Sequence, residues 1–312
     1  MTHRPSSELP TIGPSAWKQR ARSAVYLLIV LLLAAFLFHL GREPWVLAAG
    51  HWPVLVAVMI SIGAGLIVQA KSFQAVAPTA TCDLPVPTLV HIWAVSAVLS
   101  VVAPLFAGLA TRTALLMRSG MPLSACLTTS TRQIWMGLEF ALLLAAGSLP
   151  FVGLPNSHLF AAGAAAGWIL MLTVRLTTAK GAPSHRFSSA RMRRLLYTIG
   201  HRIPPHAYPW FFLQVALMGA TYYIGFNGLG AQLSWAEAIT LAALTVVLSL
   251  IVLVPNGLGF SDAVWVYVAM QAGLSLEGSV ALAILLRMAH FLSSLLISFS
   301  LYLAIGKVTF RQ

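Results

Sequence analysis

Apolar runs long enough to cross a bilayer recur along most of this chain, beginning with Ser23–Leu40. A bilayer core about 30 Å thick requires roughly 20 apolar residues in a helix. Hydrophobic residues make up 59% of the sequence and charged residues only 8%, whereas a soluble domain has about 25% charged residues. Because backbone polar groups in lipid must be satisfied internally, runs of this length form helices. The chain is therefore predicted to be an all-α polytopic membrane protein.

About six full spans are expected in a single membrane domain, residues 23–306. Residues 1–22 form a cytoplasmic tail in this prediction, and residues 307–312 form a cytoplasmic C-terminus. The first run is interpreted as a retained span and not as a removed signal peptide. In chain order, the predicted spans are Ser23–Leu40, Trp52–Ala70, Arg132–Leu149, Leu159–Val174, Ala207–Phe226 and Ser279–Leu303.

Two further apolar stretches, Thr88–Ala103 and Ala236–Val254, end at breaks that contain Pro and Gly. Each is followed by an arm too short to span a bilayer. Irregular backbone at membrane depth requires cover by protein or water, so both stretches are predicted to be broken, re-entrant hairpins buried among the spans.

The distribution of charge orients the chain. Lys and Arg number 19 against 7 Asp and Glu, a net charge of +12, and the basic residues concentrate in the segment 175–207. Because basic loops stay cytoplasmic, this segment and both termini are predicted to be inside. Met192–Ile203 within it has helical apolar spacing, which fits either an amphipathic helix on the anionic leaflet or a plain solvated loop.

The two hairpins have similar sequences. In the first hairpin, Pro104 lies in the break and Gly120 lies at the end of the short arm. In the second, Pro255 and Gly273 occupy the corresponding positions. The orientation above has the first hairpin entering from the cytoplasm and the second from outside. Paired helix breaks in opposite orientation are typical of transporters with inverted repeats and a midplane substrate site.

Charged residues at membrane depth are candidate functional groups, since each costs at least about 2.5–3.5 kcal/mol there. Arg287 lies within the last predicted span, with His290 on the same helix face. Asp262 follows the second break. Arg287 either holds a lipid phosphate with Asp262 as its orienting partner, or forms a structural ion pair with Asp262, and the two interpretations are compatible.

Further candidates surround the first hairpin. The guanidinium groups of Arg112 and Arg132 have the donor geometry for phosphate, although interfacial arginines also snorkel to headgroups without a specific role. Glu139 is a possible proton-coupling residue or a partner for Arg132. In the second break, Asn256, Gly257 and Gly259 are expected to offer backbone N–H groups to an anion.

The sequence resembles the lysylphosphatidylglycerol synthase/flippase transmembrane-domain family over roughly Ser23–Leu303. Pro255-Asn256-Gly257-Leu258-Gly259-Phe260-Ser261-Asp262 with the downstream Arg287 resembles that family's Pro-Gly-Gly-Leu-Gly-x-x-Glu…Arg pattern. Asn256 stands where Gly is usual, and Asp262 replaces Glu. Pro104, Gly108, Arg112 and Arg132 resemble its upstream element.

The resemblance implies flippase-like translocation of an anionic or phosphate-bearing envelope lipid across the bacterial inner membrane. No stretch resembles the aminoacyltransferase domain of bifunctional members, so we expect no enzyme activity. The alternative is a non-catalytic partner subunit of an envelope or lipid-biosynthesis complex; an intramembrane enzyme ranks last. No metal site is expected, because the His and Cys residues lack ligand spacing. No cofactor and no nucleic-acid partner are expected either.

Overall fold

Every element in the described part of the chain is helical, as the sequence predicts. The computed structural model describes residues 43–77, 84–102, 107–152, 156–179, 203–251 and 260–309. The first predicted span, the N-terminal tail and residues 310–312 lie outside them. The α-helices are α2 (Glu43–Gly50), α3 (Trp52–Val76), α4 (Val86–Val102), α5 (Ala107–Arg118), α6 (Leu123–Ser148), α7 (Ser157–Ala179), α9 (Tyr208–Gly228), α10 (Trp235–Ile251), α11 (Phe260–Gln271) and α12 (Leu276–Thr309), with 3₁₀ turns η1 (Leu149–Phe151) and η3 (Pro205–Ala207).

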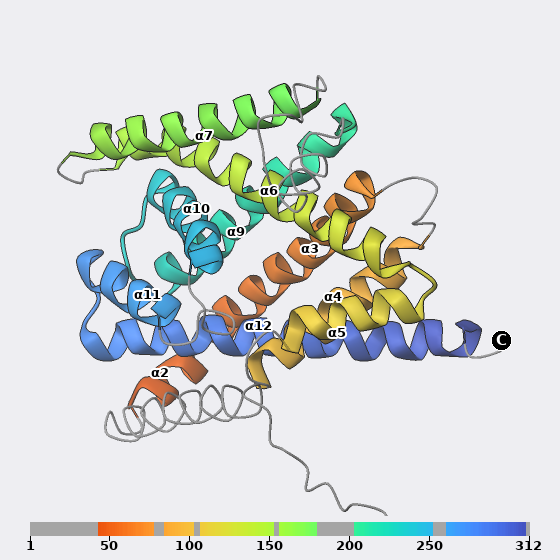
Figure 1. Ribbon diagram of the computed structural model, residues 1–312. Coiled ribbons are helices and arrows are strands. Elements are labelled where there is room, and N and C mark those ends of the chain that lie inside the picture. Colours follow the sequence, from red (N-terminus) through yellow and green to blue (C-terminus); the bar gives the residue numbers. More distant parts are fainter. Residues whose placement is uncertain are drawn as a thin grey trace, which may run out of the picture. The chain divides into compact units, whose positions relative to one another are not determined.

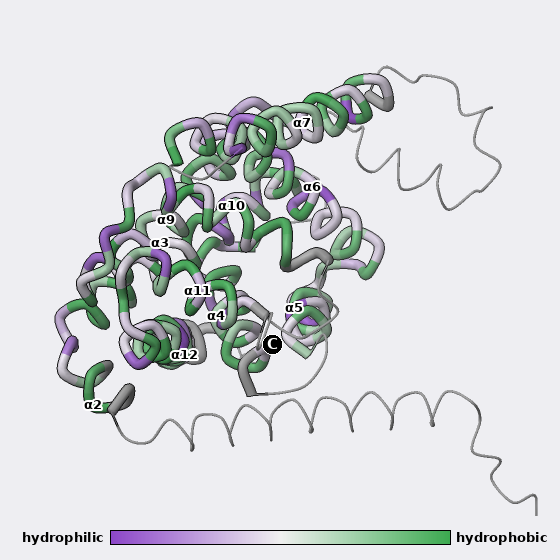
Figure 2. The backbone as a smooth tube through the Cα atoms, turned by 90° about the vertical axis from the view of Figure 1, so that its left-hand side faces the viewer, coloured by the Kyte–Doolittle hydropathy of each residue, from purple (hydrophilic) through white to green (hydrophobic). Residues whose placement is uncertain are grey.

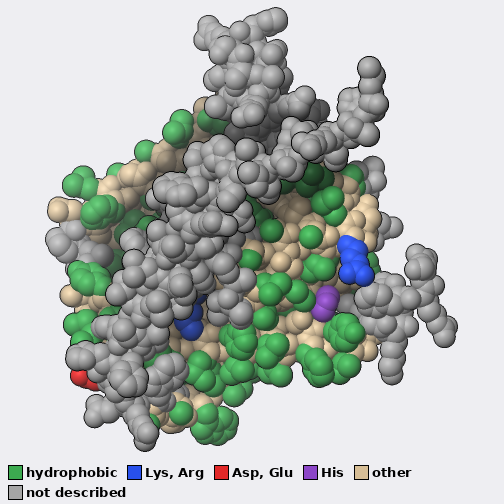
Figure 3. Space-filling view, turned by 60° about the horizontal axis from the view of Figure 1, so that its bottom comes forward, with side chains coloured by type: hydrophobic (Ala, Val, Ile, Leu, Met, Phe, Trp, Pro, Cys, Tyr) green, Lys and Arg blue, Asp and Glu red, His purple; other side chains and the backbone are tan. Residues whose placement is uncertain are grey.

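Four of these helices, α3, α6, α7 and α12, are long and apolar enough to cross a membrane. Hydrophobic residues are spread over the helices in Figure 2, where α12 is seen end-on, and the face drawn in Figure 3 is largely apolar, with few charged side chains among its described residues. The protein is a multi-pass membrane protein. The count of six full spans stays a prediction, because it also needs the undescribed first run and α9.

The arms of both predicted hairpins are helices, and the two sets of arms match in length, while their re-entrant geometry stays a prediction. The arms α4 and α10 have 17 residues each, and the return arms α5 and α11 have 12 each. Each return arm ends at a glycine with positive φ, 93° at Gly120 and 95° at Gly273. The next N–H bonds five residues back, Met121 to Leu116 O at 3.1 Å and Leu274 to Ala269 O at 3.0 Å. These are Schellman turns, for which glycine is favoured.

The helices α3 to α6, which include the first hairpin, and α9 to α12, which include the second, make corresponding contacts with each other. α3 packs along α9, α4 packs against α12, and α10 packs against α6, as Figure 1 shows. Between α3 and α4, the rings of Phe73 and Trp93 meet edge to face with centroids 4.7 Å apart, and both side chains are buried. The shorter helices α4 and α10 are therefore each packed against a long helix of the protein. This is expected for segments that end at a break in the helix, because irregular backbone at membrane depth must be covered by protein or water.

Four helix boundaries lie five residues or more from the predicted spans. Two are simple extensions, since α3 ends at Val76 and not at Ala70, and α12 ends at Thr309 and not at Leu303. α6 begins at Leu123 and not at Arg132, so Arg132 lies within the helix and is 7% exposed. α7 continues to Ala179, which places Arg175 in a helix instead of the basic loop, at 8% exposure. Both predicted ends were set at the first charge, but a buried, partnered arginine does not end a helix. Residues 180–202, including the predicted amphipathic helix, lie outside the described residues.

Close packing of α4 on α5 depends on Gly108. A Cβ there would lie 2.7 Å from the carbonyl oxygen of Ser96 and against the Ser100 hydroxyl. Overpacking of this kind costs about 1–3 kcal/mol, so Gly108→Ala should lower the thermal unfolding midpoint in detergent. The control is Gly147→Ala in α6, where a Cβ would meet nothing within 4 Å. Equal midpoints for the two variants would show that this contact does not constrain the hairpin.

Candidate functional site

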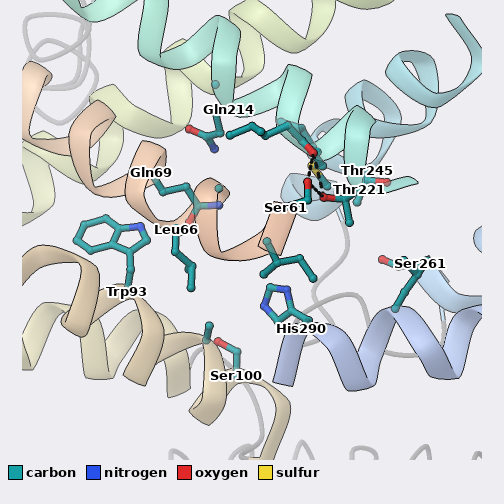
Figure 4. Close-up of a pocket in the computed structure, with 18 of the residues that line it drawn as sticks. Ser61, Leu66, Gln69, Trp93, Ser100, Gln214, Thr221, Thr245, Ser261 and His290 are labelled. Carbon is teal, nitrogen blue, oxygen red and sulfur yellow. Dashed lines mark hydrogen bonds between the residues drawn. The ribbon is translucent and has the colours of Figure 1, made fainter. Parts of the chain in front are cut away.

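A cavity of about 480 Å³ lies among α3, α4, α5, α6 and α9 to α12. Helices from both hairpins contribute to its wall. Figure 4 shows labelled side chains of α3, α4, α9 and α12 around this space. Its polar and charged lining residues are Ser61, Gln69, Ser100, Arg112, Gln133, Gln214, Thr221, Tyr222, Thr245, Ser261, Arg287 and His290. The structure thus brings Arg112 into one cavity with Arg287 and His290, which lie far from it in sequence.

Arg112 supplies a positive charge with no carboxylate partner among the described residues. Its guanidinium carbon lies 4.5 Å from the ring centroid of Trp93. Its Nε is buried and has no hydrogen-bond partner in the described part of the chain. Stacking on an aromatic face holds a guanidinium in place while leaving its in-plane donors for a ligand. Arg112 is therefore the strongest anion-binding group in the cavity.

Arg287 is paired with Asp262, which lies in the first turn of α11. Nε donates to Asp262 Oδ1 at 2.8 Å, and Nη2 donates to Oδ2 at 3.1 Å. The guanidinium carbon also lies 5.2 Å from the ring centroid of Trp265. The pair therefore joins α11 to α12 through two parallel bonds and neutralises the charge of Arg287. Both predicted roles, phosphate contact and structural pairing, are compatible with this geometry.

Three glutamines on three helices, Gln69, Gln133 and Gln214, contribute to the polar lining of the cavity. Gln133 Nε2 donates to the backbone carbonyl oxygen of Gln69 at 3.0 Å and to Ser72 Oγ at 2.9 Å. Ser72 Oγ in turn lies 3.4 Å from Gln214 Oε1. Buried polar groups at membrane depth are expensive unless they bond, so this network both links α3, α6 and α9 and gives the cavity a hydrogen-bonding surface.

Arg132 and Glu139 do not line the cavity. Arg132 Nη1 lies 3.4 Å from the carbonyl oxygen of Val76, the last residue of α3, where a cation is favoured by the helix dipole. Glu139 accepts a 2.8 Å bond from Arg175 Nη2 in a buried ion pair, and Arg175 Nη1 donates to Tyr208 Oη at 2.8 Å. Substrate contact by Arg132 and coupling by Glu139 both stay predictions.

Asn256, Gly257 and Gly259 lie outside the described residues, so their predicted anion contacts stay predictions as well. Within the described residues there is no group of three or more His, Cys, Asp or Glu side chains that could hold a metal ion.

A family model described as the lysylphosphatidylglycerol synthase TM region matches residues 23–298. The chain belongs to this family. The match covers every described helix at least in part, including both hairpins and the cavity they line. This confirms the resemblance found in the sequence motifs. No curated protein is significantly similar to the chain. Membership in the lysylphosphatidylglycerol synthase TM family associates the protein with lipid and the membrane.

Sequence reasoning missed several residues of the cavity wall and the partner of Glu139. Gln69 and Gln214 stand in otherwise apolar predicted spans, which was a usable signal, because polar side chains at membrane depth need a purpose. Trp93 and Trp265 had no such signal, since tryptophan is common in membrane helices. Arg175 was assigned to the basic loop, so it was not considered as the partner that the structure gives to Glu139.

Proposed function

We propose that this protein translocates an anionic or phosphate-bearing lipid across the inner membrane, with the headgroup passing through the cavity. The observation that carries the proposal is the convergence of Arg112 and Arg287 on one cavity, with Arg112 lacking a carboxylate partner among the described residues. An uncompensated guanidinium at membrane depth is costly, so its presence in a cavity favours an anionic ligand. Family membership, which associates the chain with lipid, agrees with this.

In the proposed mechanism the phosphate binds at Arg112, and Arg287 contributes as the headgroup displaces part of its bonding to Asp262. The matched hairpins α4–α5 and α10–α11 act as an inverted repeat, with the first facing the cytoplasm and the second facing outside. Alternating exposure of the cavity then moves the headgroup between leaflets, while the acyl chains stay in lipid. The proposal involves six spans, cytoplasmic termini and no covalent chemistry.

Reconstitution tests this directly. Vesicles would contain the purified protein and a trace of phosphatidylglycerol labelled on an acyl chain, and a membrane-impermeant reductant would report the outer-leaflet fraction. We expect the protein to make most of the labelled lipid reducible, compared with about half in protein-free vesicles. The Asp262→Asn/Arg287→Gln double variant should fold, since neither charge is left alone, and should slow the exchange.

Absence of exchange for every anionic envelope lipid would rule out translocation. The partner-subunit alternative makes the opposite prediction. It expects the protein to be isolated from membranes in a stable stoichiometric complex whose function survives substitution of Arg112.

A further inference from the structure

The return arms of the two hairpins pack in different ways. α5 lies along its own entry arm α4 and makes only a small contact with the following helix α6. α11 instead lies along the following helix α12, and its described residues do not pack along its entry arm α10. Figure 1 shows α5 beside α4 and α11 beside α12. The two hairpins, whose arms match in length, therefore have different conformations.

Two contacts place α5 on α4. A Cβ added to Gly108 would lie 2.7 Å from the carbonyl oxygen of Ser96, so the two backbones approach closely there. One turn further along α5, the guanidinium carbon of Arg112 lies 4.5 Å from the ring centroid of Trp93 on α4. Both contacts would be lost if α5 moved away from α4.

α11 is joined to α12 by the ion pair between Asp262 and Arg287, with bonds of 2.8 and 3.1 Å. A side chain of α9, Tyr222, contacts both arms of this hairpin. Its hydroxyl donates to Thr245 Oγ1 on α10 at 3.2 Å, and its ring centroid lies 5.8 Å from that of Trp265 on α11. Tyr222 thus fills space that α10 and α11 would share if they packed along each other.

A difference of this kind between two equivalent halves has a mechanical meaning. Transporters with inverted repeats expose their site alternately by moving one repeat against the other. If the two hairpins are equivalent, each can adopt the packing that the other has in this structure. The exchanged arrangement has α5 along α6 and α11 along α10.

We propose that the structure is one of two states that exchange the packing of the return arms, and that the Asp262–Arg287 pair is the latch of this state. In the second state α5 lies along α6, α11 lies along α10, the latch is open and Arg112 has left Trp93. This inference rests on the proposed function, because it treats the two hairpins as an inverted repeat.

The latch would couple the exchange to lipid. A ligand shifts an equilibrium between two states only through a difference in its affinity for them. In the observed state a phosphate must displace Asp262 to reach the full guanidinium of Arg287, whereas in the second state that guanidinium is already released. An anionic lipid should therefore bind the second state more tightly and increase its population.

Pairs of spin labels can follow both hairpins in the full-length protein, once its two native cysteines have been replaced by serine. One pair is Leu244 on α10 with Ala263 on α11, and the other is Leu109 on α5 with Ile134 on α6, all exposed positions. Double electron–electron resonance in phosphatidylcholine nanodiscs should give two distances for each pair. The shorter distance belongs to the second state, and its fraction should be the same for both pairs, since the arms exchange together.

Opening the latch by mutation should shift these populations. Asp262→Asn/Arg287→Gln leaves neither charge alone, and it removes charge-assisted hydrogen bonds that only the observed state contains. The ratio of the second state to the observed state should rise by about tenfold. Asp262→Asn alone should shift the ratio in the same direction and serves if the double variant does not fold.

The matched control is Glu277→Gln. Glu277 is an exposed carboxylate in the first turn of α12, the helix that carries Arg287, and it lies outside the cavity. Its substitution changes the charge by one unit without touching the latch, so the two populations should stay as in wild type.

The outcomes are separable. A single distance for each pair that the double variant does not change would show that the asymmetry is fixed, and would overturn the exchange. A change at one hairpin without a matching change at the other would overturn it too. Phosphatidylglycerol added to the nanodiscs should raise the second state in wild type. A shift in the latch variants with no response to phosphatidylglycerol would contradict the proposed function and leave the two-state exchange in place.

Discussion

We expect Arg112→Gln to remove most of the affinity for an anionic lipid and to leave the fold intact. Charge-assisted hydrogen bonds contribute about 1.5–3 kcal/mol, so loss of the guanidinium should weaken binding of phosphatidylglycerol by about 10- to 100-fold. Stability should stay the same or rise, because the charge has no carboxylate partner among the described residues and is costly at membrane depth. Native mass spectrometry and thermal unfolding in detergent measure the two effects.

Arg118→Gln is the matched control for that variant. Arg118 lies in the last turn of the same helix, α5, is exposed and does not line the cavity. Its substitution should leave lipid affinity within about twofold of wild type. Arg112→Lys should fall between Arg112→Gln and wild type, because lysine keeps the charge but loses the planar fork and the stacking on Trp93. Wild-type affinity in Arg112→Gln would show that the guanidinium does not contact the lipid.

Arg175→Leu should be the most destabilising single substitution proposed here. It leaves the carboxylate of Glu139, which is 2% exposed, without its ion-pair partner. Removing one partner of a buried pair costs about 3–5 kcal/mol. We expect a large drop in the thermal unfolding midpoint, measured in detergent by the change in tryptophan fluorescence.

The double variant Glu139→Leu/Arg175→Leu decides whether the pair is the cause. It should regain most of the lost stability, since no buried charge is left alone. A double variant as unstable as Arg175→Leu would trace the loss to the packing of Arg175 against Tyr208. Glu139→Gln addresses the predicted coupling role separately: if it folds and exchanges lipid at the wild-type rate at every pH, Glu139 has no part in coupling.

Much of this architecture could be predicted because apolar length and helix breaks are local signals. The arms of the two hairpins and their glycine turns followed from where Pro and Gly interrupt apolar runs. The start of α6 could not be placed this way, because Arg132 was taken to mark the membrane boundary, whereas it lies inside the helix, beside the C-terminus of α3.

Which residues meet at the cavity could not be predicted from the sequence, for a different reason. Arg287 was identified as a candidate from its depth in apolar sequence and Arg112 from its place beside the first hairpin, but no sequence signal showed that they share one cavity. That convergence depends on α3 packing along α9 and on α4 packing against α12. Likewise, Gln69 and Gln133 contact each other only because α3 and α6 meet there.

The pairing of Arg287 but not Arg112 has a consequence for how voltage would act on the protein. Together with Asp262, the described side chains at the cavity carry one net positive charge when no lipid is bound. A monoanionic headgroup brings that sum to zero. Moving one charge across 100 mV involves about 2.3 kcal/mol, so the return of the empty carrier would be the electrogenic step, and the lipid-loaded step would be insensitive to membrane potential.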